Sequence, residues 1–181
     1  MRDIAALMDA IWEAYNLAIP IGDARGRRNK FEPFFSSSES RWYTKCNEGF
    51  NLIACRMGYD KFDRRETQNP TDAQLANAIY LRMVDADGDW RQIDAVMAQQ
   101  MANAGCLVAA IDRHNDRPGP VCVVVPGNVE HSPSFNGVVP KVMNIGKDVF
   151  IGKRASFAFS AEDKPLYFCL KEDFVAPTGA A

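Results

Sequence analysis

The spacing of apolar residues changes at Gly105, and this change constrains the fold more than any other feature of the sequence. Before Gly105, apolar residues recur three or four positions apart, as they do along one face of a helix. After it, short apolar runs rich in valine are separated by turn residues, which is typical of strands joined by hairpins. Helices first and antiparallel strands second predict an α+β fold, with N-terminal helices packed on a C-terminal antiparallel sheet.

The N-terminal part of the chain predicts two helices with clear boundaries. Asp3 is the expected cap of the first helix, and Pro20 with the GDARGRR stretch ends it. The second helix spans 46–58 and stops at Gly58, because glycine favours the left-handed conformation that ends helices. The apolar residues of the first helix follow helical spacing: Ile4, Leu7, Met8, Ile11 and Tyr15.

Two more helices are expected before the change in spacing. The third begins at the NPTD stretch, 69–72, with Thr71 or Asp72 as its cap, and the ADGDW stretch closes it. The fourth spans 94–104 and ends at Gly105.

The C-terminal part predicts a hairpin and four further strands. Residues 106–111 and 121–125 form the hairpin, with the turn residues HNDRPG between them. The further strands are expected near 138–144, 148–151, 155–159 and 166–170.

A chain of 181 residues is long enough to bury its own core, and we expect one compact domain. Its parts are an N-terminal helix with an aromatic-rich arm (1–43), the main body (44–175) and a tail (176–181). The net charge of −2 and a short basic run over 25–30, interpreted as a solvated loop, argue against nucleic acid as a partner.

The first apolar run contains acidic residues and no small-residue cleavage site, which is unlike a secretory signal. We therefore expect synthesis in the cytoplasm. No apolar stretch is long enough to span a bilayer, so no membrane insertion is expected.

The five cysteines are widely spaced and form no C-x-x-C pair, and the chain has two histidines. This pattern predicts neither a disulfide framework nor a metal site. No metal or organic cofactor is expected.

Cys46 differs from the other cysteines because it stands where the second helix begins. Unpaired N–H groups and aligned peptide dipoles at a helix N-terminus favour a thiolate, which is the nucleophilic form, and Lys45 adds positive charge. Backbone N–H groups of the same turn are placed to receive a developing oxyanion. The alternative is a small buried residue at a helix start, and the remaining cysteines are expected in the core: Cys55, Cys106, Cys122 and Cys169.

Four short motifs follow one another in a particular order. They are CNEGF at 46–50, ANAI at 76–79, the stretch from MANAGCLVAAI to VVVPG at 101–127, and VPKVMNIGKDVFIGK at 139–153. Together they resemble NlpC-type cell-wall peptidases and CHAP amidases, in particular small peptidoglycan amidases of phage lysis enzymes and type VI secretion effectors. The resemblance covers about 42–170. It implies a papain-like fold, with Cys46 as the nucleophile that attacks cell-wall peptides through a thioester.

The chain departs from this family at the residue that deprotonates the cysteine. The family has histidine as the second residue of G-H-V-A-V-V, and this chain has Pro120 there, which has no titratable group. Three alternatives remain open. His114 in the hairpin turn, or His131 beyond the following strand, supplies the base; the fold persists without catalysis; or a thiolate stabilised by Lys45 carries out a slow transfer reaction.

The resemblance also assigns supporting residues. Asn144 is the candidate for orienting a base, and Asn47 and Asn77 are candidates for binding substrate. Glu48 disfavours the thiolate because it places negative charge beside Cys46.

The sequence thus supports two functional hypotheses. In the first, the chain is a cysteine amidase or peptidase that reaches the cell wall by phage or secretion-system delivery, with an immunity protein as a possible partner. In the second, it is a catalytically degenerate relative that binds a cell-wall peptide or glycan, or that has a structural role in a phage particle or secretion system.

Overall fold

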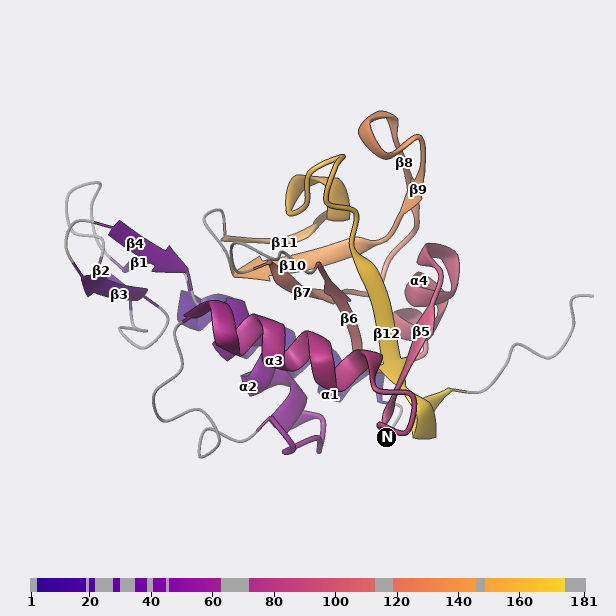
Figure 1. Ribbon diagram of the computed structural model, residues 1–181, viewed down its shortest axis with the longest axis horizontal. Helices are drawn as coiled ribbons and strands as arrows, with labels where there is room; N and C mark the ends of the chain where they lie inside the picture. Colours follow the sequence, from indigo (N-terminus) through magenta and orange to yellow (C-terminus); the bar gives the residue numbers. More distant parts are fainter. Residues whose placement is uncertain are drawn as a thin grey trace, which may run out of the picture.

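The computed structural model describes residues 3–18, 20–21, 28–29, 35–38, 41–44, 46–62, 72–112, 119–145 and 149–174 (Figure 1). Within these ranges, only the backbone is described for residues between 17 and 45 and for residues 72–76. In these residues the protein is a mixed α+β structure with four helices and a six-stranded antiparallel sheet. The α+β prediction is confirmed at this level.

The helices are α1 (Ile4–Ala18), α2 (Cys46–Arg56), α3 (Asp72–Val84) and α4 (Ala95–Asn103). The strands of the main sheet are β5 (Trp90–Ile93), β6 (Val108–Ile111), β7 (Val121–Val124), β10 (Lys141–Ile145), β11 (Val149–Arg154) and β12 (Leu166–Leu170). Three two-stranded pairs are formed by β1 (Pro20–Ile21) with β2 (Arg28–Asn29), β3 (Phe35–Ser38) with β4 (Arg41–Thr44), and β8 (Glu130–Ser132) with β9 (Gly137–Val139). Short 3₁₀ turns are η3 (Pro133–Phe135), η4 (Ala155–Phe157) and η5 (Lys171–Asp173).

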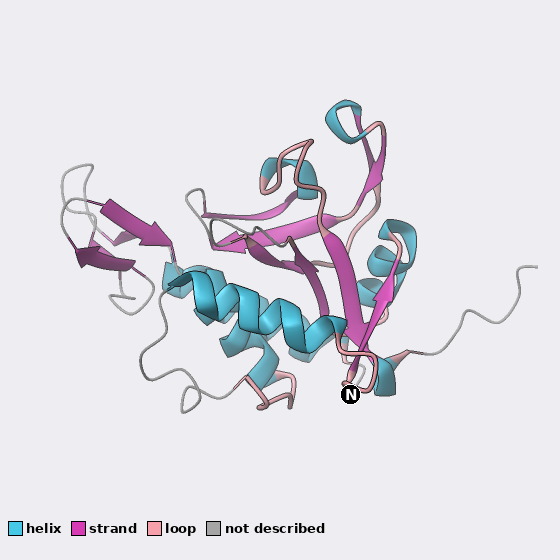
Figure 2. Ribbon diagram, in the orientation of Figure 1, coloured by secondary structure: helices cyan, strands magenta, loops and turns pink. Residues whose placement is uncertain are grey.

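The main sheet separates two layers of helix. Its strand order is β11-β10-β7-β6-β12-β5, and its neighbours are antiparallel. The helices α1, α2 and α3 lie on one side of the sheet and α4 on the other (Figure 2). Successive side chains of β7 therefore enter different cores: Val121 and Val123 face the three helices, whereas Cys122 and Val124 face α4.

The core beneath α1, α2 and α3, here called the three-helix core, is large and rich in aromatic residues. Leu7 and Ile11 of α1 and Ile53 of α2 are fully buried in it. At its far end the rings of Phe50, Tyr59, Phe62 and Trp90 pack at centroid separations of 4.9 to 6.2 Å. Because α1 contributes to this core, it is part of the same packed unit as the sheet.

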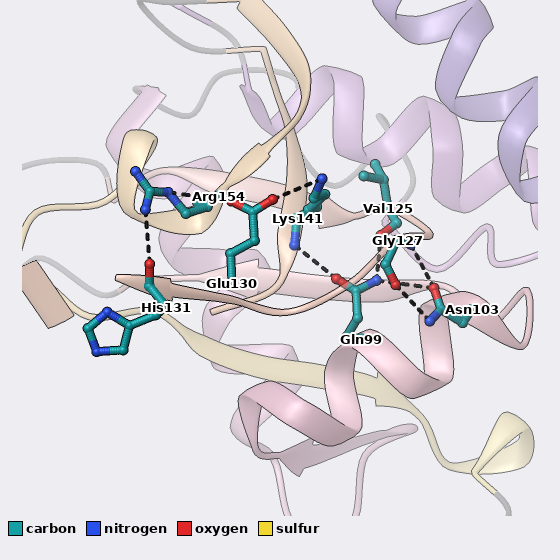
Figure 3. Close-up of polar contacts among 8 residues, drawn as sticks. All are labelled: Gln99, Asn103, Val125, Gly127, Glu130, His131, Lys141 and Arg154. Carbon is teal, nitrogen blue, oxygen red and sulfur yellow. Dashed lines mark hydrogen bonds and ion pairs between the residues drawn. The ribbon is translucent and has the colours of Figure 1, made fainter. Parts of the chain in front are cut away.

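The core beneath α4, here called the α4 core, is closed by a polar network (Figure 3). The buried Gln99 amide donates to the carbonyl of Val125 at 2.8 Å and accepts from the backbone N–H of Lys141 at 3.0 Å. One turn later, Asn103 donates to the carbonyl of Gly127 at 2.9 Å and accepts its N–H at 2.7 Å. Together the two amides fix the turn after β7 against α4.

Helix boundaries follow the predicted signals. The Asp3 carboxylate accepts from the N–H groups of Ala5 and Ala6, and Asp94 caps α4 by accepting from Met97 at 2.8 Å. Beyond the last helical residues, Gly58 and Gly105 have φ of +86° and +81°.

Other predictions were wrong in detail. Residues 155–159 begin with the 3₁₀ turn η4, and the pairs β5 with β12 and β8 with β9 were not predicted. Of the apolar residues at helical spacing in α1, Ile4 is 49% exposed, and the buried face of the helix carries Leu7, Ala10, Ile11 and Ala14. Several predictions concern residues whose structure or side chains are not described. They are the basic run at 25–30, Lys45, Thr71, the aromatic side chains of the arm at 31–43, and the tail at 176–181.

Candidate functional site

Cys46 is the first residue of α2, as predicted, and its side chain is half-buried against the three-helix core. One turn later, Gly49 lies so close to Ile145 at the end of β10 that a Cβ at this position would collide with the isoleucine side chain. Ile145 pairs with Val149 at the start of β11. The start of α2 therefore lies at the end of the sheet where β10 gives way to β11.

The same end of the sheet carries the hairpin between β6 and β7. Asp112 donates its backbone N–H to the carbonyl of Pro120 at 3.3 Å, which closes the described part of that hairpin. His114 belongs to the loop between these two residues and lies outside the described residues. Pro120 is half-buried at the entrance to β7.

Asn144 points to the other side of the sheet from Cys46. Its Oδ1 atom is 3.4 Å from the Sγ atom of Cys122, and Cys122 belongs to the α4 core. Asn144 is 6% exposed and its neighbour Val142, two residues earlier on β10, is also in the α4 core. The structure thus brings Asn144 to a buried thiol and not to the side of the sheet on which α2 packs.

A row of residues crosses the α4 side of the sheet. Tyr167 pairs with Ala110, and Ala110 pairs with Cys122, which in turn contacts Asn144. Burial, and then the charge of Cys46, raise the pKa of the Cys122 thiol well above its ordinary value. Burial and the neighbouring Cys122 thiol also raise the pKa of Tyr167. At neutral pH this row is therefore uncharged.

His131 is on β8, in the hairpin that projects from the sheet away from α1, α2 and α3 (Figure 1). Its side chain is exposed, and its backbone carbonyl accepts from Arg154 at 2.9 Å. Figure 3 shows the imidazole directed away from the ion pairs of Glu130 with Lys141 and Arg154. The structure does not bring His131 to Cys46.

The two asparagines expected to bind substrate differ in their surroundings. Asn47 follows Cys46 and is 6% exposed. Asn77 is half-buried on α3, and its Oδ1 atom is buried without a hydrogen-bond donor among the described residues.

The remaining cysteines are not all in the core. Cys106, Cys122 and Cys169 are buried, as expected, but Cys55 is exposed on the last turn of α2, which corrects the prediction for that residue. Its thiol is 3.5 Å from the Oδ1 atom of Asn51, one turn earlier.

A cavity that the sequence analysis missed lies at the C-terminal end of α2. It has a volume of about 340 Å³ and is lined by Gly58, Tyr59, Asp60, Lys61, Gly88, Asp89, Leu170, Lys171 and Glu172. Lys61 contacts both carboxylate oxygens of Asp89, at 3.0 and 2.8 Å, and lowers the pKa of that carboxyl. The ADGDW stretch, which supplies Gly88 and Asp89, was interpreted only as the end of a helix.

Nowhere in the described segments do three His, Cys, Asp or Glu side chains gather into a group able to bind a metal ion. None of the helices in these segments has the length and apolarity needed to cross a membrane. In comparisons with known proteins, no family model and no curated protein matches the chain.

Proposed function

We propose that the chain is a cysteine hydrolase of the papain-like type that cleaves amide bonds in short peptides of the bacterial cell wall. The observation that carries the proposal is the position of Cys46: it opens a helix that begins at one end of the sheet, and its side chain is only half-buried. Of the cysteines, Cys106, Cys122 and Cys169 are enclosed in the α4 core, and Cys55 is in the last turn of α2, where the helix dipole disfavours a thiolate.

In the proposed reaction the Cys46 thiolate attacks the carbonyl carbon of the peptide bond and forms a tetrahedral intermediate. N–H groups of the first turn of α2 stabilise the oxyanion. Collapse of this intermediate breaks the C–N bond, the base gives the leaving amine the proton that it took from the Cys46 thiol, and an acyl thioester remains on Cys46. Water then attacks the thioester and releases the carboxylic acid and the thiol.

The base in this proposal is His114. The described residues that flank it in the sequence, Asp112 and Pro120, lie at the end of the sheet where α2 begins. His131 is the weaker candidate because it is exposed on the β8–β9 hairpin.

A second candidate function, a binding protein on the same scaffold, is favoured by a specific observation. Pro120 replaces the histidine of the motif, and the Asn144 amide contacts the buried Cys122 on the α4 side of the sheet. With neither residue directed to Cys46, the scaffold would bind a cell-wall peptide or glycan without cleaving it.

The test is digestion of purified peptidoglycan by the native chain and by Cys46→Ala, with released fragments identified by mass spectrometry. Cys55→Ala is the matched control, since it removes a thiol from the other end of the same helix. We expect fragments from the native chain and from Cys55→Ala, and a loss of roughly a thousandfold or more in rate for Cys46→Ala. Equal rates from all three folded proteins would contradict the role of Cys46.

Silence from all three proteins would contradict hydrolysis of this substrate. Sedimentation of the native chain with insoluble peptidoglycan then tests the second candidate function. Retention on the pellet supports binding, and recovery of the chain in the supernatant contradicts it.

A further inference from the structure

The proposed site has two halves that meet where α2 lies on the sheet. The nucleophile Cys46 and the N–H groups of its turn belong to α2, whereas the proposed base belongs to the connection between β6 and β7. Gly49, one turn after Cys46, is buried against Ile145, the last residue of β10. The contact between Gly49 and Ile145 therefore bears on how far the two halves lie from each other.

This contact leaves no room for a side chain on Gly49. A Cβ there would collide with Cδ1 of Ile145 and lie 3.3 and 3.4 Å from its Cγ1 and Cβ. Ile145 is 2% exposed and packs in the three-helix core, so its side chain cannot rotate without displacing its neighbours. Because glycine lowers helix stability relative to alanine, this residue suits the contact with the sheet better than it suits the helix.

We propose that Gly49 is a positioning residue for Cys46. Without a side chain at this position, α2 rests directly on β10, and this fixes the thiol and the N–H groups of the first turn relative to the sheet. A side chain would push the start of α2 off the sheet and away from the proposed base. A displacement of about 1 Å between reacting groups is enough to lower a rate about a hundredfold. The catalytic consequence rests on the proposed function, but the position of Cys46 does not.

The experiment compares Gly49→Ala, Ile145→Val and the double variant, each in a Cys55→Ala chain. Valine keeps Cγ1 and Cβ but lacks Cδ1, the atom with which a Cβ on Gly49 would collide. The double variant therefore restores the space while it keeps alanine in the helix, and Ile145→Val is its matched control. Removing the exposed Cys55 thiol leaves Cys46 as the accessible one, because the three cysteines of the α4 core are buried.

Two rates are measured for each chain. The first is alkylation of Cys46 by iodoacetamide at about pH 9.5, where an exposed thiol is mostly ionised and the rate reports access to it. The second is the release of fragments from purified peptidoglycan, which also requires the base. Mass spectrometry locates the alkylated cysteine, so labelling of the buried cysteines identifies an unfolded chain.

We expect Gly49→Ala to be alkylated at Cys46 about threefold faster or more, because displacing α2 uncovers a half-buried thiol. Its digestion of peptidoglycan should fall about a hundredfold. In the double variant both rates should return to within about threefold of those of Ile145→Val. Damage to the thiol itself would lower both rates together, so opposite changes are specific to a loss of position.

An unchanged alkylation rate in Gly49→Ala would overturn the inference, and so would a double variant that recovers neither rate. Where Gly49→Ala also labels the buried cysteines, the double variant decides. Labelling of Cys46 alone, with digestion equal to that of Ile145→Val, supports the inference, and continued labelling of the buried cysteines overturns it. A native chain that releases no fragments would contradict the proposed hydrolysis. Faster alkylation in Gly49→Ala, restored in the double variant, would still support the position of Cys46, so the two failures are distinguishable.

Discussion

The two sides of the sheet differ in how their buried polar groups are hydrogen-bonded. On the α4 side, Gln99 and Asn103 pair with the backbone of the turn after β7, and the Cys122 thiol contacts the Asn144 amide. On the three-helix side, the core is almost wholly apolar, and the polar groups of interest lie at its margin, where Cys46 is half-buried and the Asn77 oxygen has no described donor. The paired amides on the α4 side hold the turn after β7 in place, whereas the Asn77 oxygen receives no hydrogen bond from the described residues.

The comparison also bears on what a mutation should do. Removing one member of a paired network leaves its partners buried without hydrogen bonds, and this costs more than the lost bond itself. Removing a polar atom that already lacks a partner carries no such penalty. The three predictions below use this difference, beginning with the residue at which the two helical layers meet.

Gly105 should show the largest effect on stability. It follows α4, has φ of +81°, and lies so close to the backbone of Asp3 and Ile4, at the start of α1, that a Cβ would collide with main-chain atoms. Main-chain atoms cannot rotate away, so we expect Gly105→Ala to lower the free energy of unfolding by about 4 kcal/mol, from backbone strain and overpacking together. Urea unfolding monitored by circular dichroism measures this.

Gly58→Ala is the matched control for Gly105→Ala. Gly58 has a similar φ of +86°, but nothing lies within 4 Å of the position a Cβ would occupy. Its cost should be limited to the conformational term of about 1 kcal/mol. Equal losses in the free energy of unfolding for the two variants would show that the close contact between Gly105 and the backbone of α1 adds nothing to the effect of the substitution.

Gln99→Leu should have the next largest effect. The substitution leaves the carbonyl of Val125 and the N–H of Lys141 without their partner in a buried setting. We expect a loss of about 2–3 kcal/mol in the free energy of unfolding. If Gln99→Leu and Asn77→Leu have the same effect on urea unfolding, the distinction between the two sides of the sheet is wrong.

The smallest effect concerns alkaline pH and the row of residues on the α4 side. Burial, then the charge of Cys46, raise the pKa of Cys122 well above 9.0, and burial, then Cys122, raise the pKa of Tyr167. Above about pH 9 the unfolded chain loses a thiol proton that the folded chain keeps, so stability must fall as pH rises. The slope is at most about 1.4 kcal/mol per pH unit for each such group.

The alkaline slope is measured from urea unfolding of the native chain and of Cys122→Ala between pH 8 and 10.5. The variant should lose stability less steeply over this range, whatever its stability at pH 8. An unchanged slope would mean that the Cys122 thiol does not contribute to the pH dependence.

Local signals were enough to predict much of the fold. As expected, Asp94 caps the start of α4 and Gly105 follows its end. Gly58 stands after the end of α2, and residues 166–170 form β12 as predicted. These features depend on caps, on glycine and on apolar runs, which act over a few residues. The strand β5 was missed because its burial depends on β12, a partner more than seventy residues away in the chain.

The site was harder to predict than the fold, for a reason that Asn144 illustrates. Its place on a strand was predictable, but the side of the sheet that it faces depends on strand register, and a shift of one residue reverses every side chain. The cavity at the end of α2 combines three segments distant in sequence. Cys46 was placed correctly because its helix boundary is a local feature.

The position of β12 has a consequence for the order in which the protein assembles. This strand is the last of the sheet to be synthesised, yet it lies between β6 and β5, with both of which it pairs. While a ribosome makes the chain from its N-terminus, β6 has an open edge and β5 has no neighbour until residue 170 has left the exit tunnel. Nascent chains that stall earlier should therefore need a chaperone to cover that edge, whereas completion of the strand closes the sheet in a single late step.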